Sequence, residues 1–173
     1  MRLVSADPST YRLIENDPLS WLEQAEGARM SAEVIWPHSV EARSHHPSGA
    51  GIREKQLAFM HSFMLLTALA FESLIKGLAV AKGIGWRTLK EDGGHGISTY
   101  VTRVTAVSDA EPELLSRLQE YLVWAGRYVI PLREPRYEDG SHRRRWTSKD
   151  SEIISALFGR LKDELHAAAK SKA

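Results

Sequence analysis

The apolar positions along the chain follow helical spacing in most of its segments. Residues 52–82 form the longest predicted helix, and from Phe63 to Val80 apolar side chains fall on nearly every side of it. A helix that is apolar all round is typical of the centre of a protein. Two further predicted helices have one apolar face each. The first buries Leu114, Leu118, Tyr121, Leu122 and Ala125, and the second, over about 149–169, buries Ile154, Leu157, Phe158, Leu161 and Leu165.

Capping and turn-forming residues bound these elements. Asp17 is a typical N-cap residue and Pro18 suits the first helical position, so a helix is predicted over 17–36. Ser108 and Glu111 have the spacing of a capping box. Proline, glycine and polar residues predict loops at 37–51 and 132–147.

The segment 97–107 carries two conflicting signals. Its β-branched residues favour a strand, whereas the spacing of Ile97, Val101 and Val104 favours a helix. Because no second strand is available to pair with it, we predict a helix. The result is a single all-α domain over 1–173, a bundle of about five helices with 52–82 at its centre and 17–36 at its periphery.

Composition excludes several classes of chemistry. The chain has 173 residues, no cysteine and a formal net charge of +1. Disulfides, thiolate zinc sites and cysteine nucleophiles are therefore excluded, and no overall charge attracts nucleic acid. The longest charge-free stretch, 56–71, is shorter than the roughly 20 residues of a membrane span. With no signal-peptide pattern at the N-terminus, we expect a cytoplasmic protein with no membrane segment.

Glu72 and Lys76 place two charges within the apolar helix, one turn apart. An unpaired buried carboxylate is costly, so Glu72 needs a donor, and Lys76 at i+4 has the favoured orientation for an ion pair. One interpretation is an ion pair that stabilises the helix or lies at its solvent edge. The other is a functional polar site at the bundle centre or a dimer seam.

Two more polar residues are candidates for the same site. His95 lies at the start of the predicted third helix, where the helix dipole favours a neutral ring. Arg127 belongs to a stripe that is either a solvated face or an interface, with Arg117, Glu120 and Trp124. We hypothesise that His95 and Arg127 lie near Glu72 and Lys76 in one polar cluster.

These segments, in this order, resemble the HEPN superfamily. The resemblance covers about residues 52–131: a long helix with Phe71-Glu72 and Lys76-Gly77, a Gly94-His95 helix start, and a helix ending in Trp124-Ala-Gly-Arg127-Tyr128. It implies a helical bundle, usually a homodimer, in prokaryotic toxin–antitoxin, stress, defence or nucleotide-handling systems. Many members are metal-independent ribonucleases in which two chains bring paired arginines and histidines into one cleft.

The ribonuclease signature of that family is an arginine followed by a histidine four to six residues further on. Arg136 and His142 have this spacing but enclose Asp139-Gly140, which predicts a turn. Arg160 and His166 have it on a predicted helix, although Leu161 stands where the family favours a polar residue. Histidine would move the proton and arginine would hold the phosphate. Arg160 with His166, or Arg127 with His95, are therefore the catalytic candidates.

The densest positive run, with Arg143, Arg144, Arg145 and Trp146, suits phosphate contacts and base stacking, or is a solvated loop. His45 and His46 lack the spacing that directs two rings to one metal, and we expect no metal and no cofactor.

Three functions follow from these patterns. The first is a binding or assembly module of an RNA- or nucleotide-related system, without a complete ribonuclease signature. The second is an active ribonuclease, and the third is a structural domain that binds another protein.

Overall fold

The described part of the chain is helical. The computed structural model describes residues 8–44, 50–85, 88, 96–106, 111–125 and 148–171, and no strand occurs among them. This confirms the predicted all-α class. The elements are the helices α1 (Pro8–Glu15), α2 (Pro18–Ser44), α3 (Ala50–Ala81), α5 (Ile97–Val104), α6 (Glu111–Glu120) and α8 (Ser148–Lys170), with a π-helix η1 (Tyr121–Ala125) directly after α6.

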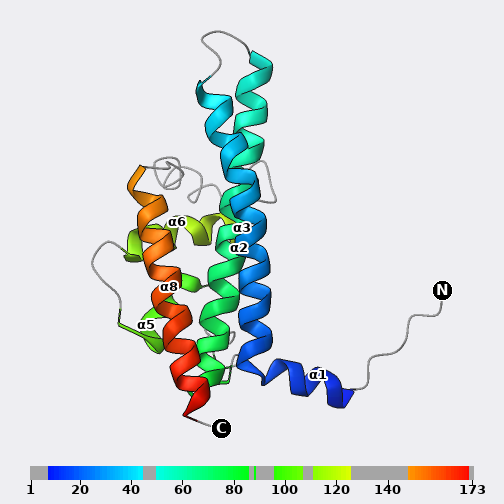
Figure 1. The fold of residues 1–173 in the computed structure, drawn as a ribbon, viewed down its shortest axis with the longest axis vertical. Coiled ribbons are helices and arrows are strands. Elements are labelled where there is room, and N and C mark those ends of the chain that lie inside the picture. Colours follow the sequence, from blue (N-terminus) through cyan, green and yellow to red (C-terminus); the bar gives the residue numbers. More distant parts are fainter. Residues whose placement is uncertain are drawn as a thin grey trace, which may run out of the picture.

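Helix α3 lies at the centre of the bundle, as its apolar composition predicts. It contacts α2, α5, α6, η1 and α8. Helices α2 and α3 form a long antiparallel hairpin that extends beyond the others, α8 lies alongside it, and α1 turns away at its base (Figure 1). Among the large α3 side chains, four have no exposed surface: Phe71, Leu74, Ile75 and Leu78.

By length and composition alone, the segment Ala58–Ala81 of α3 is long and apolar enough to cross a membrane. In this fold 72% of that apolar window is buried. The same pattern is therefore explained by packing against the surrounding helices, as in the core helix of a bundle.

The ambiguous segment 97–107 contains the helix α5. Its apolar side chains Ile97, Tyr100, Val101 and Val104 are all buried. The N-cap, Gly96, offers no side chain for the free amides at the helix start. Instead Gln119 of α6 accepts hydrogen bonds at its Oε1 from the Ser98 amide (3.2 Å) and hydroxyl (2.8 Å). Burial of one face and this contact from another helix thus override the strand propensity.

The start of α2 matches the prediction from Asp17 and Pro18. The Asp17 carboxylate accepts hydrogen bonds from the amides of Leu19 (3.1 Å) and Ser20 (3.0 Å) and from the Ser20 hydroxyl (2.6 Å). The Ser20 hydroxyl is the largest influence on the carboxyl pKa, and the pKa of Asp17 is lowered despite partial burial. Asp17 is therefore a true N-cap.

The predicted loop at 37–51 was wrong at both of its ends. Helix α2 continues through Pro37 to Ser44, and α3 begins at Ala50. Contacts between the two helices compensate for the hydrogen bond that proline cannot donate. The rings of Trp36 and Phe63 are 4.8 Å apart, and those of His38 and Phe59 are 5.7 Å apart.

Helix α1 was not predicted from the sequence. This short helix is held by tertiary contact, because the Trp21 indole Nε1 donates a hydrogen bond to the Glu15 carbonyl (3.0 Å). Its apolar side chains Leu13 and Ile14 are exposed, so burial of these side chains does not hold the helix in place.

Candidate functional site

Glu72 and Lys76 form the ion pair that their spacing predicts. Lys76 Nζ lies 2.9 Å from Glu72 Oε1, and the two side chains are 17% and 7% exposed. The same ammonium lies 5.5 Å from the centroid of the Trp21 ring of α2. Lys76 therefore neutralises the buried carboxylate and contributes a cation–π contact to the packing of α2 on α3.

The next residue, Gly77, lies where three helices approach one another closely. A Cβ atom at this position would lie 2.8 Å from Leu165 Cδ1 of α8 and 2.9 Å from Trp21 Cβ of α2. Only glycine leaves room for both side chains. The pair of Glu72 and Lys76 is thus part of a tightly packed junction of α2, α3 and α8.

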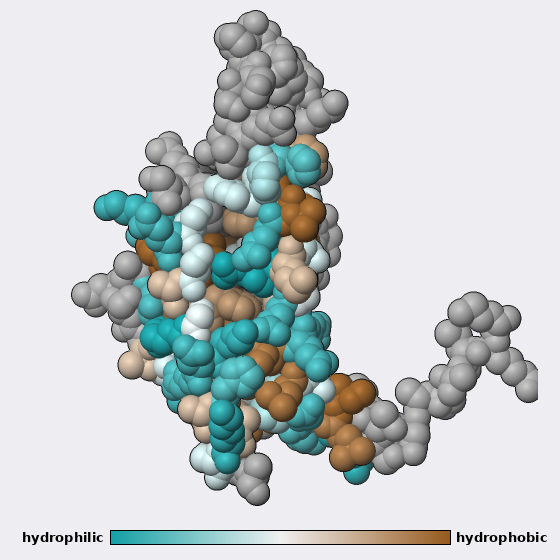
Figure 2. Space-filling model, viewed as in Figure 1, coloured by the Kyte–Doolittle hydropathy of each residue, from teal (hydrophilic) through white to brown (hydrophobic). Residues whose placement is uncertain are grey.

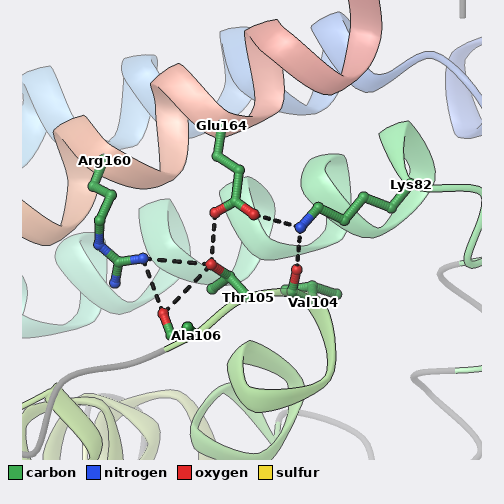
Figure 3. A network of polar contacts seen from close by, with 6 residues as sticks. All are labelled: Lys82, Val104, Thr105, Ala106, Arg160 and Glu164. Atoms are coloured by element: carbon green, nitrogen blue, oxygen red, sulfur yellow. Dashed lines mark hydrogen bonds and ion pairs between the residues drawn. The ribbon is translucent and has the colours of Figure 1, made fainter. Parts of the chain in front are cut away.

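A second group of polar residues, here called the α8 cluster, joins α8 to the ends of α3 and α5 (Figure 3). Glu164 of α8 pairs with Lys82 and accepts a hydrogen bond at Oε2 from the Thr105 hydroxyl (2.6 Å). Lys82 also donates to the Val104 carbonyl at the end of α5. Lysine thereby caps a helix end whose carbonyl has no partner within its own helix.

The titration of Glu164 reflects this environment. Partial burial raises the pKa of its carboxyl, but hydrogen bonds from Lys82 and Thr105 and the nearby charges of Lys82 and Arg160 lower it by more. The pKa of Glu164 is therefore below its usual value of 4.5. The ionised form is favoured by the folded protein.

Arg160, one of the two catalytic candidates on α8, is engaged in the same cluster. Its Nη1 donates to the Ala106 carbonyl (3.0 Å) and lies 3.4 Å from the Thr105 hydroxyl oxygen. Its Nη2 pairs with Glu111 Oε2 of α6 at 2.9 Å. The guanidinium therefore links α8 to α6 and to the residues after α5.

His166 does not converge with Arg160. Six residues along a helix correspond to about 120° of rotation and about 9 Å of rise, so the two side chains leave α8 in different directions. His166 is partly buried and makes no hydrogen bond or ion pair with another described residue. Arg160 and His166 make no hydrogen bond with each other, and their catalytic role stays a prediction.

Arg117 does not lie on a solvated face, which corrects one interpretation of its stripe. It is 6% exposed, and its two terminal nitrogens lie 2.6 and 2.8 Å from the carboxylate oxygens of Asp150, which is 1% exposed. The hydrogen bonding that Arg117 donates to the Asp150 carboxylate is the main cause that raises the pKa of Arg117. Because α8 begins against α6, this charge pair is enclosed between the two helices.

The π-helix η1 continues α6 at the position where the sequence analysis expects an ordinary helix. The Tyr121 ring at its start lies 5.6 Å from the His61 ring of α3. Trp124 belongs to this element, and its side chain is outside the described residues. Single-turn π-helices are frequent at functional sites.

Several candidate residues lie outside the described part of the chain. They are His45, His46, His95, Arg127, Arg136, His142, Arg143, Arg144, Arg145 and Trp146, together with Ser108 of the expected capping box. The grouping of His95 and Arg127 with Glu72 and Lys76 stays a hypothesis. Among the residues that are described, no three histidine or acidic side chains are placed to hold a metal ion.

Comparison with protein-family models, curated proteins and solved structures gives no match. The resemblance to the HEPN superfamily therefore rests on the residues quoted for it, and what it implies about function belongs to a proposal.

Sequence reasoning missed the polar contacts that join distant segments. Lys82 and Glu164 are 82 residues apart, and Arg117 and Asp150 are 33 residues apart. No local spacing connects such pairs. In the sequence Arg117 lies in a stripe with Glu120 and Arg127, so no apolar pattern around it indicated its burial.

Proposed function

We propose that this protein is a HEPN-like binding or assembly module of an RNA- or nucleotide-related stress, toxin–antitoxin or defence system in the prokaryotic cytoplasm. In this proposal it binds RNA through the run Arg143–Trp146 and has no ribonuclease centre built on Arg160 and His166. The resemblance over about residues 52–131 supports the class of protein, and the side-chain geometry supports the lack of catalysis.

One observation carries the non-catalytic part of the proposal. The Arg160 side chain is 40% exposed, but its guanidinium is bound to Glu111 and to the Ala106 carbonyl, so it has a structural role. An arginine that stabilises a phosphoryl transition state needs donors directed at the substrate. To serve in catalysis, Arg160 would have to leave the carboxylate that it already neutralises.

A test of RNA association compares two matched variants. Fluorescence anisotropy of a labelled single-stranded RNA is measured with the full chain at about 50 mM and about 200 mM salt, because phosphate contacts weaken as salt rises. The variant with Arg143, Arg144 and Arg145 all changed to alanine should lose most of this binding. The control changes the exposed Lys149 and Lys170 of α8 to alanine and should bind nearly as the native chain does. Equal binding by both variants would contradict the proposal.

An active ribonuclease is the second candidate. His166 favours it, since this ring makes no hydrogen bond or ion pair with another described residue and is available to a second chain. Cleavage of end-labelled RNA in EDTA decides between the candidates. We expect intact RNA, whereas cleavage that His166→Ala abolishes would establish the ribonuclease and reject the first proposal.

Assembly as a homodimer is part of the proposal, and a structural domain that binds another protein is the third candidate. Exposed apolar side chains on α1 and α2 support both: Leu13 (72%), Ile14 (55%), Met30 (66%) and Val34 (69%). Met30 and Val34 are one turn apart on the same face of α2. Light scattering of the native chain and of the variant Met30→Glu with Val34→Glu separates the cases. A dimer that the variant dissociates supports the homodimer, and a native monomer rejects it.

A further inference from the structure

A cavity of about 190 Å³ lies between α2, α3 and α8, away from the α8 cluster and from the pair of Glu72 and Lys76. Figure 2 views this side of the molecule, where hydrophilic side chains of α2 and α8 border a hollow that contains more hydrophobic residues. The residues that could bind a ligand there are Arg29, Glu33, Trp36, Phe63, Thr67 and Ser155.

Two aromatic rings and Ile154 form the apolar part of the cavity. The Trp36 ring of α2 and the Phe63 ring of α3 have centroids 4.8 Å apart and planes inclined by 41°. Planar molecules gain favourable stacking or edge contacts from such rings. A cavity of about 150 Å³ can hold benzene, so this one has room for a single ring with a small polar substituent.

Arg29 is held in one orientation and still has a free donor. Its Nε donates to Glu33 Oε1 (2.8 Å), its Nη2 donates to the Ser155 hydroxyl (3.2 Å), and its guanidinium lies 5.1 Å from the Phe158 ring centroid. Nη1 makes no hydrogen bond with another described residue. The guanidinium is therefore fixed before a ligand binds, which lowers the entropic cost of binding.

Glu33 determines which ligand charge the cavity favours. One of its carboxylate oxygens binds Arg29, and the other makes no hydrogen bond with a described residue. The pair presents one donor and one acceptor side by side with no net charge. This arrangement complements an amide-type edge, which has an acceptor next to a donor, and disfavours an anion.

Thr67 gives independent evidence for a ligand. The residue is 1% exposed, it lines the cavity, and its hydroxyl has no hydrogen-bond partner among the described residues. A threonine inside a helix usually donates to the carbonyl three or four residues before it. A buried hydroxyl without a partner is costly, and a polar group of a bound molecule would remove that cost.

We propose that this cavity binds a small, neutral, planar molecule through an amide-type edge held by Arg29 and Glu33, with its ring against Trp36 and Phe63. Aromatic carboxamides and nucleobases share this chemistry. The site is independent of the RNA association proposed above, so either proposal can fail without the other.

The test titrates the isotope-labelled full chain with benzamide, cytosine, benzoate and toluene, and follows the NMR signal of the Trp36 indole N–H, assigned with Trp36→Phe. Benzamide or cytosine should shift this signal with a dissociation constant on the order of 1 mM, the range expected of such small molecules. Benzoate should bind at least about threefold more weakly because Glu33 repels it. Tighter binding of cytosine than of benzamide would point to a nucleobase as the natural ligand, and the reverse order to a free carboxamide.

Variants then distinguish specific recognition from non-specific binding. Glu33→Gln should bring the affinities for benzoate and benzamide together, and Thr67→Val should weaken benzamide about fivefold. The matched control is Glu26→Gln, which removes another α2 carboxylate that pairs with α8, through Lys162, but does not line the cavity. Similar affinities for all four compounds, an unchanged order in Glu33→Gln, or no shift of the Trp36 signal would each overturn the proposal.

Discussion

Helices α2, α3 and α8 meet in two contrasting ways along their lengths. At one end Gly77 leaves no space, and Trp21 and Leu165 would collide with a single added Cβ atom. At the other end the same three helices border the cavity that Arg29 and Thr67 line. In Figure 1, α8 lies close to the hairpin near its C-terminal end and diverges from it toward its N-terminal end.

The two ends also differ in whether their buried polar groups have partners. At the closed end the charges of Glu72 and Lys76 neutralise each other. At the open end the Thr67 hydroxyl has no partner among the described residues. Polar groups that are all hydrogen-bonded hold helices together. A buried hydroxyl without a partner, on a residue that lines a cavity, costs free energy that a hydrogen bond to a ligand would offset. The contrast separates a region that stabilises the bundle from a region suited to binding.

The largest effect should come from the contact that holds the diverging end of α8. Asp150→Ala leaves the buried Arg117 charge without its bidentate partner and should cost about 3–5 kcal/mol of unfolding free energy. Urea unfolding at neutral pH measures it. Asp163→Ala, at an exposed position of the same helix, is the control and should change stability by less than about 0.5 kcal/mol. A loss below about 1 kcal/mol for Asp150→Ala would show that the pair does not anchor α8.

The glycines of these helices test the contrast directly. Gly77→Ala forces a methyl group against Leu165 and Trp21 and should destabilise the protein by about 1–3 kcal/mol. Gly27→Ala of α2 meets nothing within 4 Å and should stabilise it by up to about 1 kcal/mol through helix propensity. Thermal unfolding of both variants gives the sign. Equal effects would mean that the closed end is not tightly packed.

A smaller effect on stability is expected from replacing two threonines, one with and one without a hydrogen-bond partner. Thr67→Val replaces an unpartnered buried hydroxyl and should leave stability unchanged or raise it by about 1 kcal/mol. Thr105→Val removes the hydrogen bond to Glu164 and should lower stability by about 1 kcal/mol. Chemical unfolding of the two variants side by side measures the difference. Destabilisation by Thr67→Val would indicate that its hydroxyl already has a partner.

The smallest effect concerns acid stability. Because the folded protein lowers the pKa of Glu164 below 4.5, its contribution is present above that pH and is lost as pH falls through the folded pKa. Between about pH 7 and pH 3 the native chain should therefore lose more stability than Glu164→Gln, which has no such proton to gain. Urea unfolding at both pH values checks this. Parallel losses in the two proteins would contradict it.

The sequence predicted the elements whose signal is local. Spacing and single residue types predicted three features. They are the N-cap of α2 at Asp17, the central position of α3, and the buried face of α5 that carries Val101. The same local reasoning failed at Pro37, where it ended a helix that contact with α3 continues. It also missed α1, whose attachment depends on Trp21 of the next helix.

The candidate sites also differ in whether their contacts are local in sequence. The pair of Glu72 and Lys76 lies within one helical turn, so its i,i+4 spacing alone predicted the contact. Arg160 and His166 matched a spacing as well, yet Arg160 is bound to Glu111 and Ala106, which belong to other segments.

By itself the sequence determined the all-α class, the central apolar helix and the pairing of charges within it, because helical periodicity and capping depend on residues a few positions apart. The tertiary structure alone decided that Arg117 is buried with Asp150, that Arg160 is bound to Glu111, and that Arg29 and Thr67 share a cavity. Those contacts join helices that are distant in sequence, and the packing of α8 against the hairpin and against α6 brings them together.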